Sequence, residues 1–165
     1  MDNLPKYVIN LERDKHKLIR FDKPMTEQNI NYEIWRGSIV AKSSDLEKFH
    51  KEFEFTRGTR SVNYPGNVGS AFAHLSLWNY CLEQPYEYFI IFEDNCIVKK
   101  MFKQNIDYYL KKIKKFDFLN LNVIRPSGQT NDNILFKYKK LEKVPFPPPN
   151  TWMSSYIVSK KMIYF

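Results

Sequence analysis

Short apolar runs alternate with amphipathic stretches along this chain. Apolar, β-branched runs predict buried strands, and helical spacing between the runs predicts covering helices. The predicted strands lie at 7–11, 32–35, 88–92, 116–124 and 155–158, with an edge strand at 134–138. This order predicts an α/β fold, a single domain over 1–165 with a mixed, mostly parallel sheet flanked by helices.

The helices are predicted from apolar spacing and from residues that begin or end helices. A first helix passes through Leu18 and Phe21 and should end at Pro24. A shorter helix is expected at 44–53 and a Lys-rich helix at 101–115. Ser159 can cap a last helix. The clearest stripe, beginning after an Asn67 cap and stopping at Pro85, consists of Val68, Ala71, Phe72, Leu75, Trp78 and Leu82.

The charge balance is strongly basic, with a net charge of +8 from 26 Lys and Arg against 18 Asp and Glu. Only 6 of the cations are Arg, the side chain suited to bidentate reading of bases and phosphates. The balance therefore favours anionic substrates or surfaces over nucleic acid, and solubility alone explains it equally well. For the Lys-rich helix, a peripheral contact with an anionic membrane surface and a plain solvated face both stay open.

Two classes of site find no support in the sequence. The 2 cysteines and 3 scattered histidines show neither a disulfide framework nor the spacing of a zinc site. The start of the chain has no signal-peptide pattern, and its apolar runs are too short to cross a bilayer. A cytoplasmic location is the expectation from this pattern.

Polar residues follow the most apolar strand abruptly. Glu93, Asp94 and Asn95 come directly after Phe89–Phe92, and an apolar strand tolerates adjacent carboxylates only at its mouth. Alternation along a strand sends Glu93 and Asn95 to one side and Asp94 to the other. Oxygen ligands of this kind suit Mg²⁺ or Mn²⁺ bound together with a diphosphate. An ordinary acidic turn explains the same residues.

Four segments in order resemble the glycosyltransferase family 25 domain of lipooligosaccharide and collagen galactosyltransferases. Residues 7–13 (YVINLER) are similar to its opening strand and loop, and residues 66–78 (GNVGSAFAHLSLW) to its GEIGCALSHLxxW helix. Residues 92–95 (FEDN) are similar to its LEDD motif, and residues 155–160 (SYIVSK) to a later strand.

The resemblance implies a GT-A type, Rossmann-like fold and an inverting hexosyltransferase. Its donor would be a UDP-sugar, with galactose or glucose as the sugar, and its acceptor a hydroxyl of a glycan or protein, as in lipopolysaccharide biosynthesis. Glu93, Asp94 and Asn95 then correspond to the family's metal-binding acidic motif, which makes a divalent metal (Mn or Mg) the expected cofactor. A metal there would stabilise the departing diphosphate.

Further donor-binding residues follow from the same segments. Asn10 and Arg13 are expected near the nucleotide, although an ordinary polar loop explains them too. His74 lines the donor site or is a packed helix histidine. Gly66 and Gly69 flank the predicted helix start, where bare amides could bind phosphate, and close packing is the alternative.

Departures from the family pattern support a second hypothesis. Asn95 replaces a carboxylate, and family members usually continue well past the segment that matches 156–161. No catalytic base can be named. Asp132 is the only Asp in a predicted loop late in the chain, and it is not assigned this role. The alternative function is a catalytically degenerate or truncated homologue that binds nucleotide-sugar without transferring it.

Overall fold

A five-stranded mixed sheet forms the centre of the molecule. The computed structural model describes residues 1–37, 65–113, 115–121 and 154–164. The strand order is β2-β1-β3-β5-β4, in which β1 pairs in parallel with β2 and β3, and β5 is antiparallel to both neighbours. The strands are β1 (Lys6–Asn10), β2 (Glu33–Arg36), β3 (Tyr88–Glu93), β4 (Phe118–Asn120) and β5 (Ser155–Ser159). The pairings of β1 are parallel and those of β5 are antiparallel, so the predicted mixed sheet is confirmed, and the GT-A assignment stays a prediction.

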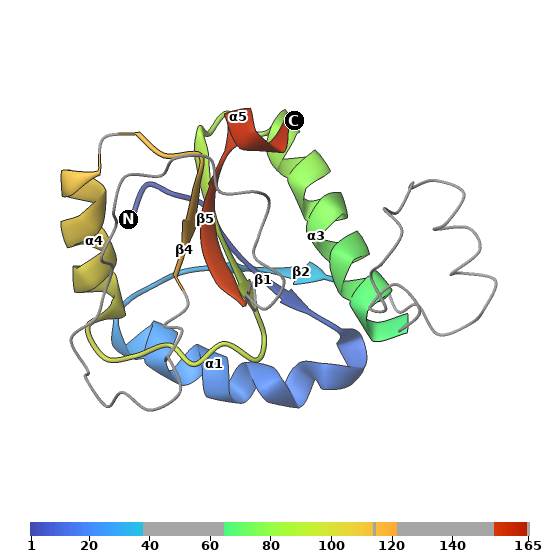
Figure 1. The fold of residues 1–165 in the computed structure, drawn as a ribbon. Helices are drawn as coiled ribbons and strands as arrows, with labels where there is room; N and C mark the ends of the chain where they lie inside the picture. Colours follow the sequence, from blue (N-terminus) through green and yellow to red (C-terminus); the bar gives the residue numbers. More distant parts are fainter. Residues whose placement is uncertain (38–64, 114, 122–153, 165) are drawn as a thin grey trace, which may run out of the picture.

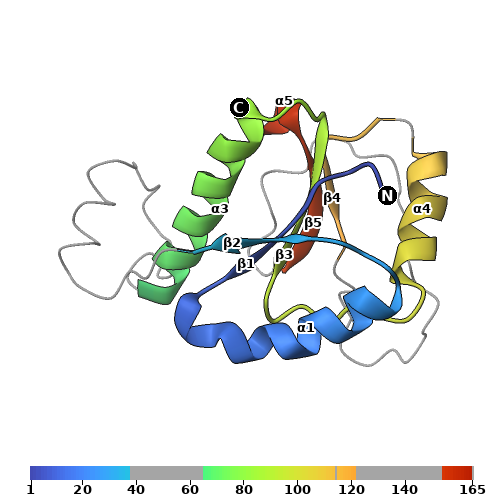
Figure 2. The same ribbon diagram turned by 180° about the vertical axis from the view of Figure 1, so that it is seen from behind.

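Helices cover both faces of this sheet, as predicted (Figures 1 and 2). A short 3₁₀ turn (Glu12–Asp14) connects β1 to α1 (Lys15–Glu27). α1 packs on one face together with α4 (Phe102–Lys112), and α3 (Pro65–Glu83) packs on the other with α5 (Lys160–Ile163). The sheet therefore separates two apolar cores, one on each face.

Alternation along the strands assigns side chains to these two cores. On β1, Val8 is buried in the core beneath α1, while its neighbours Tyr7 and Ile9 are buried in the core beneath α3. The central strands β3 and β5 follow the same rule, with Ile90 on the α1 side and Tyr156 on the α3 side. Two consecutive residues of one strand can thus serve two different environments.

The first helix does not end at Pro24. It continues to Glu27 with the proline inside it, which overturns the predicted stop. A proline removes one N–H from the helix, but continuing the helix keeps Phe21 and Met25, one turn apart, fully buried at 0% exposure. The apolar contact of Met25 with the sheet offsets the missing hydrogen bond.

The α3 helix differs from its prediction in both its start and its buried face. It begins at Pro65, a favourable first helical residue, so Asn67 lies inside the helix rather than capping it. The buried stripe is Ala73, Leu77 and Cys81, while Ala71 of the predicted stripe is exposed. Apolar residues occur on nearly every side of this helix, so spacing alone cannot identify the face that packs on the sheet.

Other boundaries agree more closely with the sequence pattern. Ser159 caps α5 as predicted, because its hydroxyl accepts a hydrogen bond from the Met162 amide at 3.1 Å. The α4 helix lies within the predicted 101–115, whereas the strand predicted at 116–124 begins at Phe118. The helix at 44–53 and the edge strand at 134–138 lie outside the described residues. Within the part of the chain that the structure describes, every helix is too short or too polar to span a bilayer.

Candidate functional site

Polar side chains gather where the parallel strands end. β1 ends at Asn10, β2 at Arg36 and β3 at Glu93, and their parallel pairing brings these ends to one edge of the sheet. Figures 1 and 2 show that α1 and α3 both begin near this edge. Open α/β sheets bind their ligands at the carboxyl ends of the strands, so this edge is the candidate site.

Asn10 is the centre of the first group of contacts, which we call the Asn10 cluster (Asn10, Asp14, Arg36 and Asp94). The side-chain amide of Asn10 is 1% exposed and donates to the Asp94 Oδ2 at 2.8 Å and to the Asp14 carbonyl at 3.1 Å. Its carbonyl oxygen accepts from the Arg36 guanidinium at 2.6 Å. One buried amide thus joins residues from three neighbouring strand ends.

Two cationic side chains lie at the Asn10 cluster, and each contacts a carboxylate. Arg36 also lies 3.4 Å from a carboxylate oxygen of Glu12, and its side chain remains 43% exposed. Lys17 bonds the Asp14 carboxylate at 2.9 Å, and this bond raises the pKa of Lys17, with a further contribution from the charge of Asp94. Both side chains are partly exposed and therefore accessible to an anionic ligand.

The second group of contacts lies on the opposite face of the sheet, and we call it the Glu93 chain (Trp78, Tyr156, His74 and Glu93). The Trp78 indole N–H donates to the Tyr156 hydroxyl at 3.0 Å, and that hydroxyl is 2.6 Å from the His74 Nδ1. The His74 Nε2 lies 3.2 Å from the Glu93 Oε1, which also accepts from Ser70 at 3.1 Å. The chain runs from the buried core to the sheet edge.

Burial along the Glu93 chain falls toward that edge. Tyr156 is fully buried, which raises the pKa of its hydroxyl well above the usual value, and it therefore keeps its proton. His74 is 6% exposed, whereas the Glu93 side chain is 22% exposed. Glu93 is thus the residue of the Glu93 chain whose side chain a ligand at the sheet edge can contact.

Comparison with known proteins identifies the chain. Residues 3–163 match the model of glycosyltransferase family 25, described as an LPS biosynthesis protein family. This chain belongs to glycosyltransferase family 25. It is also 25% identical over 139 residues, 83% of its length, to a Haemophilus influenzae protein described as "Putative glycosyltransferase". The match covers 45% of that relative, so the chain spans less than half the length of the curated relative it matches.

The family segments converge on the candidate site. The opening segment supplies Asn10, the α3 segment supplies His74, and the acidic segment supplies Glu93 and Asp94, which share the sheet edge. Glu93 and Asp94 have different partners: Glu93 bonds His74 of α3, whereas Asp94 bonds Asn10 of β1. The prediction that Glu93 and Asp94 point to opposite sides agrees with these contacts, whereas Asn95 is an exposed residue of the turn after β3.

Two predicted site residues are less closely connected. The Arg13 side chain is 64% exposed and lies 4.0 Å from the Asp14 carboxylate, at the margin of the Asn10 cluster. Gly66 lies in the first turn of α3, which begins at Pro65, so its amide has no partner within the helix and the prediction for Gly66 stays a prediction. Gly69 is buried in the second turn of α3, where amides bond within the helix, so bare amides cannot be the reason for a role there.

Sequence reasoning missed two residues of the site. Arg36 lies at the end of a weakly apolar strand, and only the pairing of β2 with β1 brings it to Asn10. Tyr156 is distant from His74 in the sequence, and only the antiparallel placement of β5 beside β3 brings it close. The sequence signal available for Arg36 was that a polar residue comes directly after a predicted strand. Tyr156 lies within a predicted strand, so this signal did not apply to it.

The acidic segment offers a partial set of ligands for a divalent cation. Within the described ranges, no group of three His, Cys, Asp or Glu side chains lies together as a fully protein-bound metal requires. A cation bound with a nucleotide needs fewer protein ligands, because it takes phosphate oxygens as well. Asp94 fits that role, since only its Oδ2 is hydrogen-bonded within the described part of the chain.

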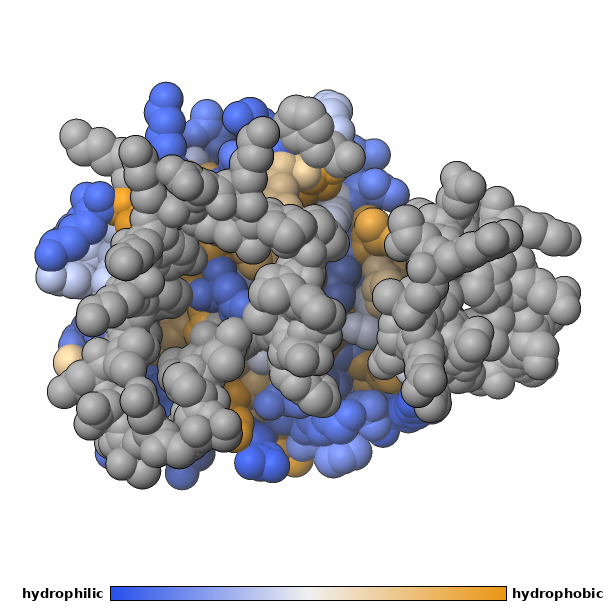
Figure 3. Space-filling view, in the orientation of Figure 1, coloured by the Kyte–Doolittle hydropathy of each residue, from blue (hydrophilic) through white to orange (hydrophobic). Residues whose placement is uncertain are grey.

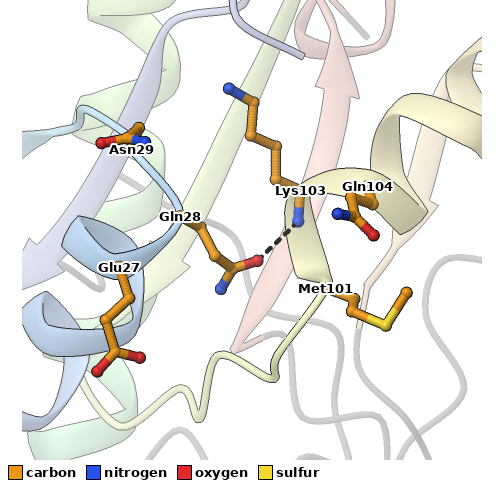
Figure 4. A pocket seen from close by; sticks show the side chains of 6 residues that line it. All are labelled: Glu27, Gln28, Asn29, Met101, Lys103 and Gln104. Atoms are coloured by element: carbon orange, nitrogen blue, oxygen red, sulfur yellow. Dashed lines mark hydrogen bonds between the residues drawn. The ribbon is translucent and has the colours of Figure 1, made fainter.

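A separate cavity of about 260 Å³ lies at the other end of α1 (Figure 4). Its lining comes from the end of α1 and the start of α4, where the Gln28 side chain accepts from the Lys103 amide at 3.1 Å. Hydrophilic residues predominate over α1 along the lower edge of the molecule (Figure 3). The cavity shares no residue with the Asn10 cluster or the Glu93 chain.

Proposed function

We propose that this family 25 chain binds a UDP-sugar at the carboxyl edge of its sheet and transfers the hexose, galactose or glucose, to a hydroxyl of a glycan or protein. The observation that carries the proposal is the Asn10 cluster, in which Asn10 holds Arg36 and Asp94 together at this edge. Membership of the family supports glycosyl transfer, and the edge supplies a charged, organised place for the donor.

The charges of the edge suit a nucleoside diphosphate. Arg36 keeps guanidinium N–H groups beyond those that bond Asn10 and Glu12, and a planar guanidinium matches phosphate oxygens. Lys17 adds a second cation at the start of α1, and Arg13 a third at the margin. Preorganised cations of this kind stabilise the negative charge that accumulates on a departing diphosphate.

Asp94 would hold the divalent metal (Mn or Mg), with Glu93 and the Asn95 amide oxygen as the neighbouring oxygen ligands of the motif. The metal's contribution would be to neutralise charge on the diphosphate. Asn10 orients the Asp94 carboxylate by bonding its Oδ2, and Oδ1 accepts no hydrogen bond from a described residue. A fixed carboxylate loses little freedom when the ligand binds.

Transfer with inversion requires one displacement at the anomeric carbon. The acceptor oxygen forms a bond to that carbon as the bond to the diphosphate oxygen breaks, and UDP leaves with the electron pair. The acceptor hydroxyl proton passes to a base. The chain's own part is to bind UDP and orient the anomeric carbon toward the acceptor.

Calorimetry with UDP, in the presence and absence of Mn²⁺, tests the donor site. We expect Asp94→Asn to weaken UDP binding with Mn²⁺ by about tenfold or more, since supporting and ligating residues commonly contribute on that scale. Glu83→Gln makes the same charge change on the exposed end of α3 and should leave binding unchanged. Equal affinities for wild type and Asp94→Asn would refute the assignment of Asp94.

A binding protein without transferase activity is the second candidate, favoured by Asn95 in place of a carboxylate. Release of UDP from a panel of UDP-sugars, with glycan and peptide acceptors, distinguishes the two candidates. Turnover supports the transferase. UDP binding without turnover supports the binding protein.

A further inference from the structure

We propose that Trp78 and Tyr156 are positioning residues that make the His74 Nδ1 a hydrogen-bond acceptor, so that its Nε2–H donates to Glu93 and fixes the orientation of the Glu93 carboxylate. The proposal rests on the proposed function, because it assigns Glu93 a prepared role at the donor and acceptor edge. It is carried by the four side chains of the Glu93 chain and by their burial.

The indole nitrogen of Trp78 can only donate a hydrogen bond. Its N–H lies 3.0 Å from the Tyr156 oxygen, so that oxygen accepts this bond. The Tyr156 hydroxyl has one hydrogen of its own and is fully buried, and a buried hydroxyl hydrogen needs an acceptor. The His74 Nδ1, at 2.6 Å, is in place to accept it.

The direction of that bond decides the state of His74. If Nδ1 accepts a hydrogen, it carries no proton, and a neutral imidazole then has its proton on Nε2. Nε2 lies 3.2 Å from the Glu93 Oε1, and an ionised carboxylate can only accept. Tyr156 and the Glu93 carboxylate thus favour the same tautomer from the two sides of the ring, and Trp78 fixes the direction of the Tyr156 bond.

The two carboxylate oxygens of Glu93 differ in their hydrogen bonds. Oε1 receives hydrogen bonds from both His74 and Ser70, whereas no described residue donates to Oε2. His74 and Ser70 both belong to α3, so the carboxylate is held against that helix. Glu93 is thus presented to the sheet edge with one occupied and one available oxygen, a prepared arrangement for a group that contacts substrate or metal.

Nuclear magnetic resonance of protein labelled with ¹⁵N-histidine tests the tautomer directly. Long-range ¹H–¹⁵N spectra distinguish protonated from unprotonated ring nitrogens, and the His74 signals are those lost in His74→Gln. We expect a single neutral Nε2–H form in the wild type. In the Glu93→Gln background, where the side chain at position 93 can donate as well as accept, Tyr156→Phe removes the donor to Nδ1 and should yield both tautomers, whereas Tyr164→Phe, at an exposed tyrosine, should change nothing.

Two further variants separate this mechanism from simple packing. Trp78→Phe, in the same Glu93→Gln background, removes a group that does not bond His74, yet it frees the Tyr156 oxygen to accept and should also yield both tautomers. Glu93→Gln should keep the Nε2–H tautomer, because Tyr156 sets it, and should shift the Nε2 proton resonance. An Nδ1–H form in the wild type, or an unmoved resonance in Glu93→Gln, would overturn the proposal.

Kinetics measures the effect on transfer. Compared with wild type, we expect His74→Leu and Tyr156→Phe to lower kcat by about 10- to 100-fold while the Kd for UDP stays within about twofold. His74→Gln, whose amide can replace the Nε2–H donor, should recover part of the loss. Unchanged kcat in His74→Leu, or equal loss of kcat and UDP affinity, would refute positioning. If the wild type transfers no sugar, the proposed function fails, and the spectra alone decide the tautomer.

Discussion

The Asn10 amide nitrogen lies 2.8 Å from the Asp94 Oδ2, a bond between residues that are 84 positions apart in the sequence. An asparagine suits this place because it must donate to Asp94 and to the Asp14 carbonyl while accepting from Arg36. Aspartate has no N–H to donate, and an apolar side chain would leave all three partners without this bond. One residue thus determines the geometry of the Asn10 cluster.

Asn10→Asp should destabilise the protein by about 2–3 kcal/mol, because two donors are lost and a second carboxylate is buried beside Asp94. Urea unfolding at pH 7 measures the change. Asn31→Asp adds the same charge at an exposed position and should have little effect. Equal losses of stability in the two variants would mean that the bonds of Asn10 carry no net stability.

Arg36→Lys should weaken UDP binding by about tenfold, or ~1.4 kcal/mol. Lysine keeps the charge but cannot bond Asn10 and a phosphate with one planar group. Calorimetry with UDP and Mn²⁺ gives the affinity, and Arg20→Lys, on the exposed side of α1, provides the matched control. An affinity equal to that of the wild type would place the diphosphate away from Arg36.

The sequence predicted most of the layered fold because apolar strands carry a local signal. Residues 88–92 could only be a buried strand, and the carboxylates that follow it had to lie at its mouth. The buried face of α3 could not be predicted in the same way. Its apolar residues point in every direction, and the contact with Tyr156 of β5 decides which of them are buried.

The candidate site was predictable only where its residues share a strand end. Asp94 and Asn10 follow adjacent parallel strands, so their proximity could be expected from topology. His74 was left open between packing and donor binding, and the structure places it in a buried bond to Tyr156. That bond depends on a long-range antiparallel pairing, which no local pattern in α3 encodes.

Pro24→Ala should stabilise the protein by about 1–3 kcal/mol. Alanine restores the missing N–H inside α1 and is the better helix former, although the greater freedom of the unfolded chain offsets part of this gain. Thermal and urea unfolding measure the difference. Pro85→Ala, at an exposed position after α3, should not stabilise the protein. A loss of stability in Pro24→Ala would show that α1 needs the proline's fixed geometry.

The hydroxyl of Tyr32 should make stability depend on alkaline pH. Burial, followed by its hydrogen bond to Asp22, raises the pKa of Tyr32 to about 12, from about 10 in the unfolded chain. The stabilising contribution is therefore complete below pH 10 and is lost as the pH rises toward 12.

Urea unfolding of wild type and Tyr32→Phe from pH 9 to about 11.5 tests the direction of this pH dependence. The difference in unfolding free energy between the two proteins should shrink as the pH rises above about 10. Asp22→Asn removes the charge beside the hydroxyl and lowers the pKa of Tyr32 in the folded protein, so the loss should be smaller and should end at a lower pH. A difference that grows with pH would contradict the assignment.

Cys81 should resist alkylation in the native protein. Its side chain is fully buried, and burial raises the pKa of its thiol to about 12, so little of the reactive thiolate forms at pH 8. Iodoacetamide labelling followed by peptide mass spectrometry should show Cys81 modified only as fast as the protein unfolds.

Cys96→Ala provides the clean measurement, because the sequence contains only 2 cysteines and Cys81 is then the single thiol. Adding urea should raise the labelling rate to that of a free thiol. Rapid labelling without urea would mean that the core beneath α3 opens readily. Cys81 belongs to the same apolar core as Tyr156, so an open core would also give water access to the hydroxyl that sets the tautomer of His74.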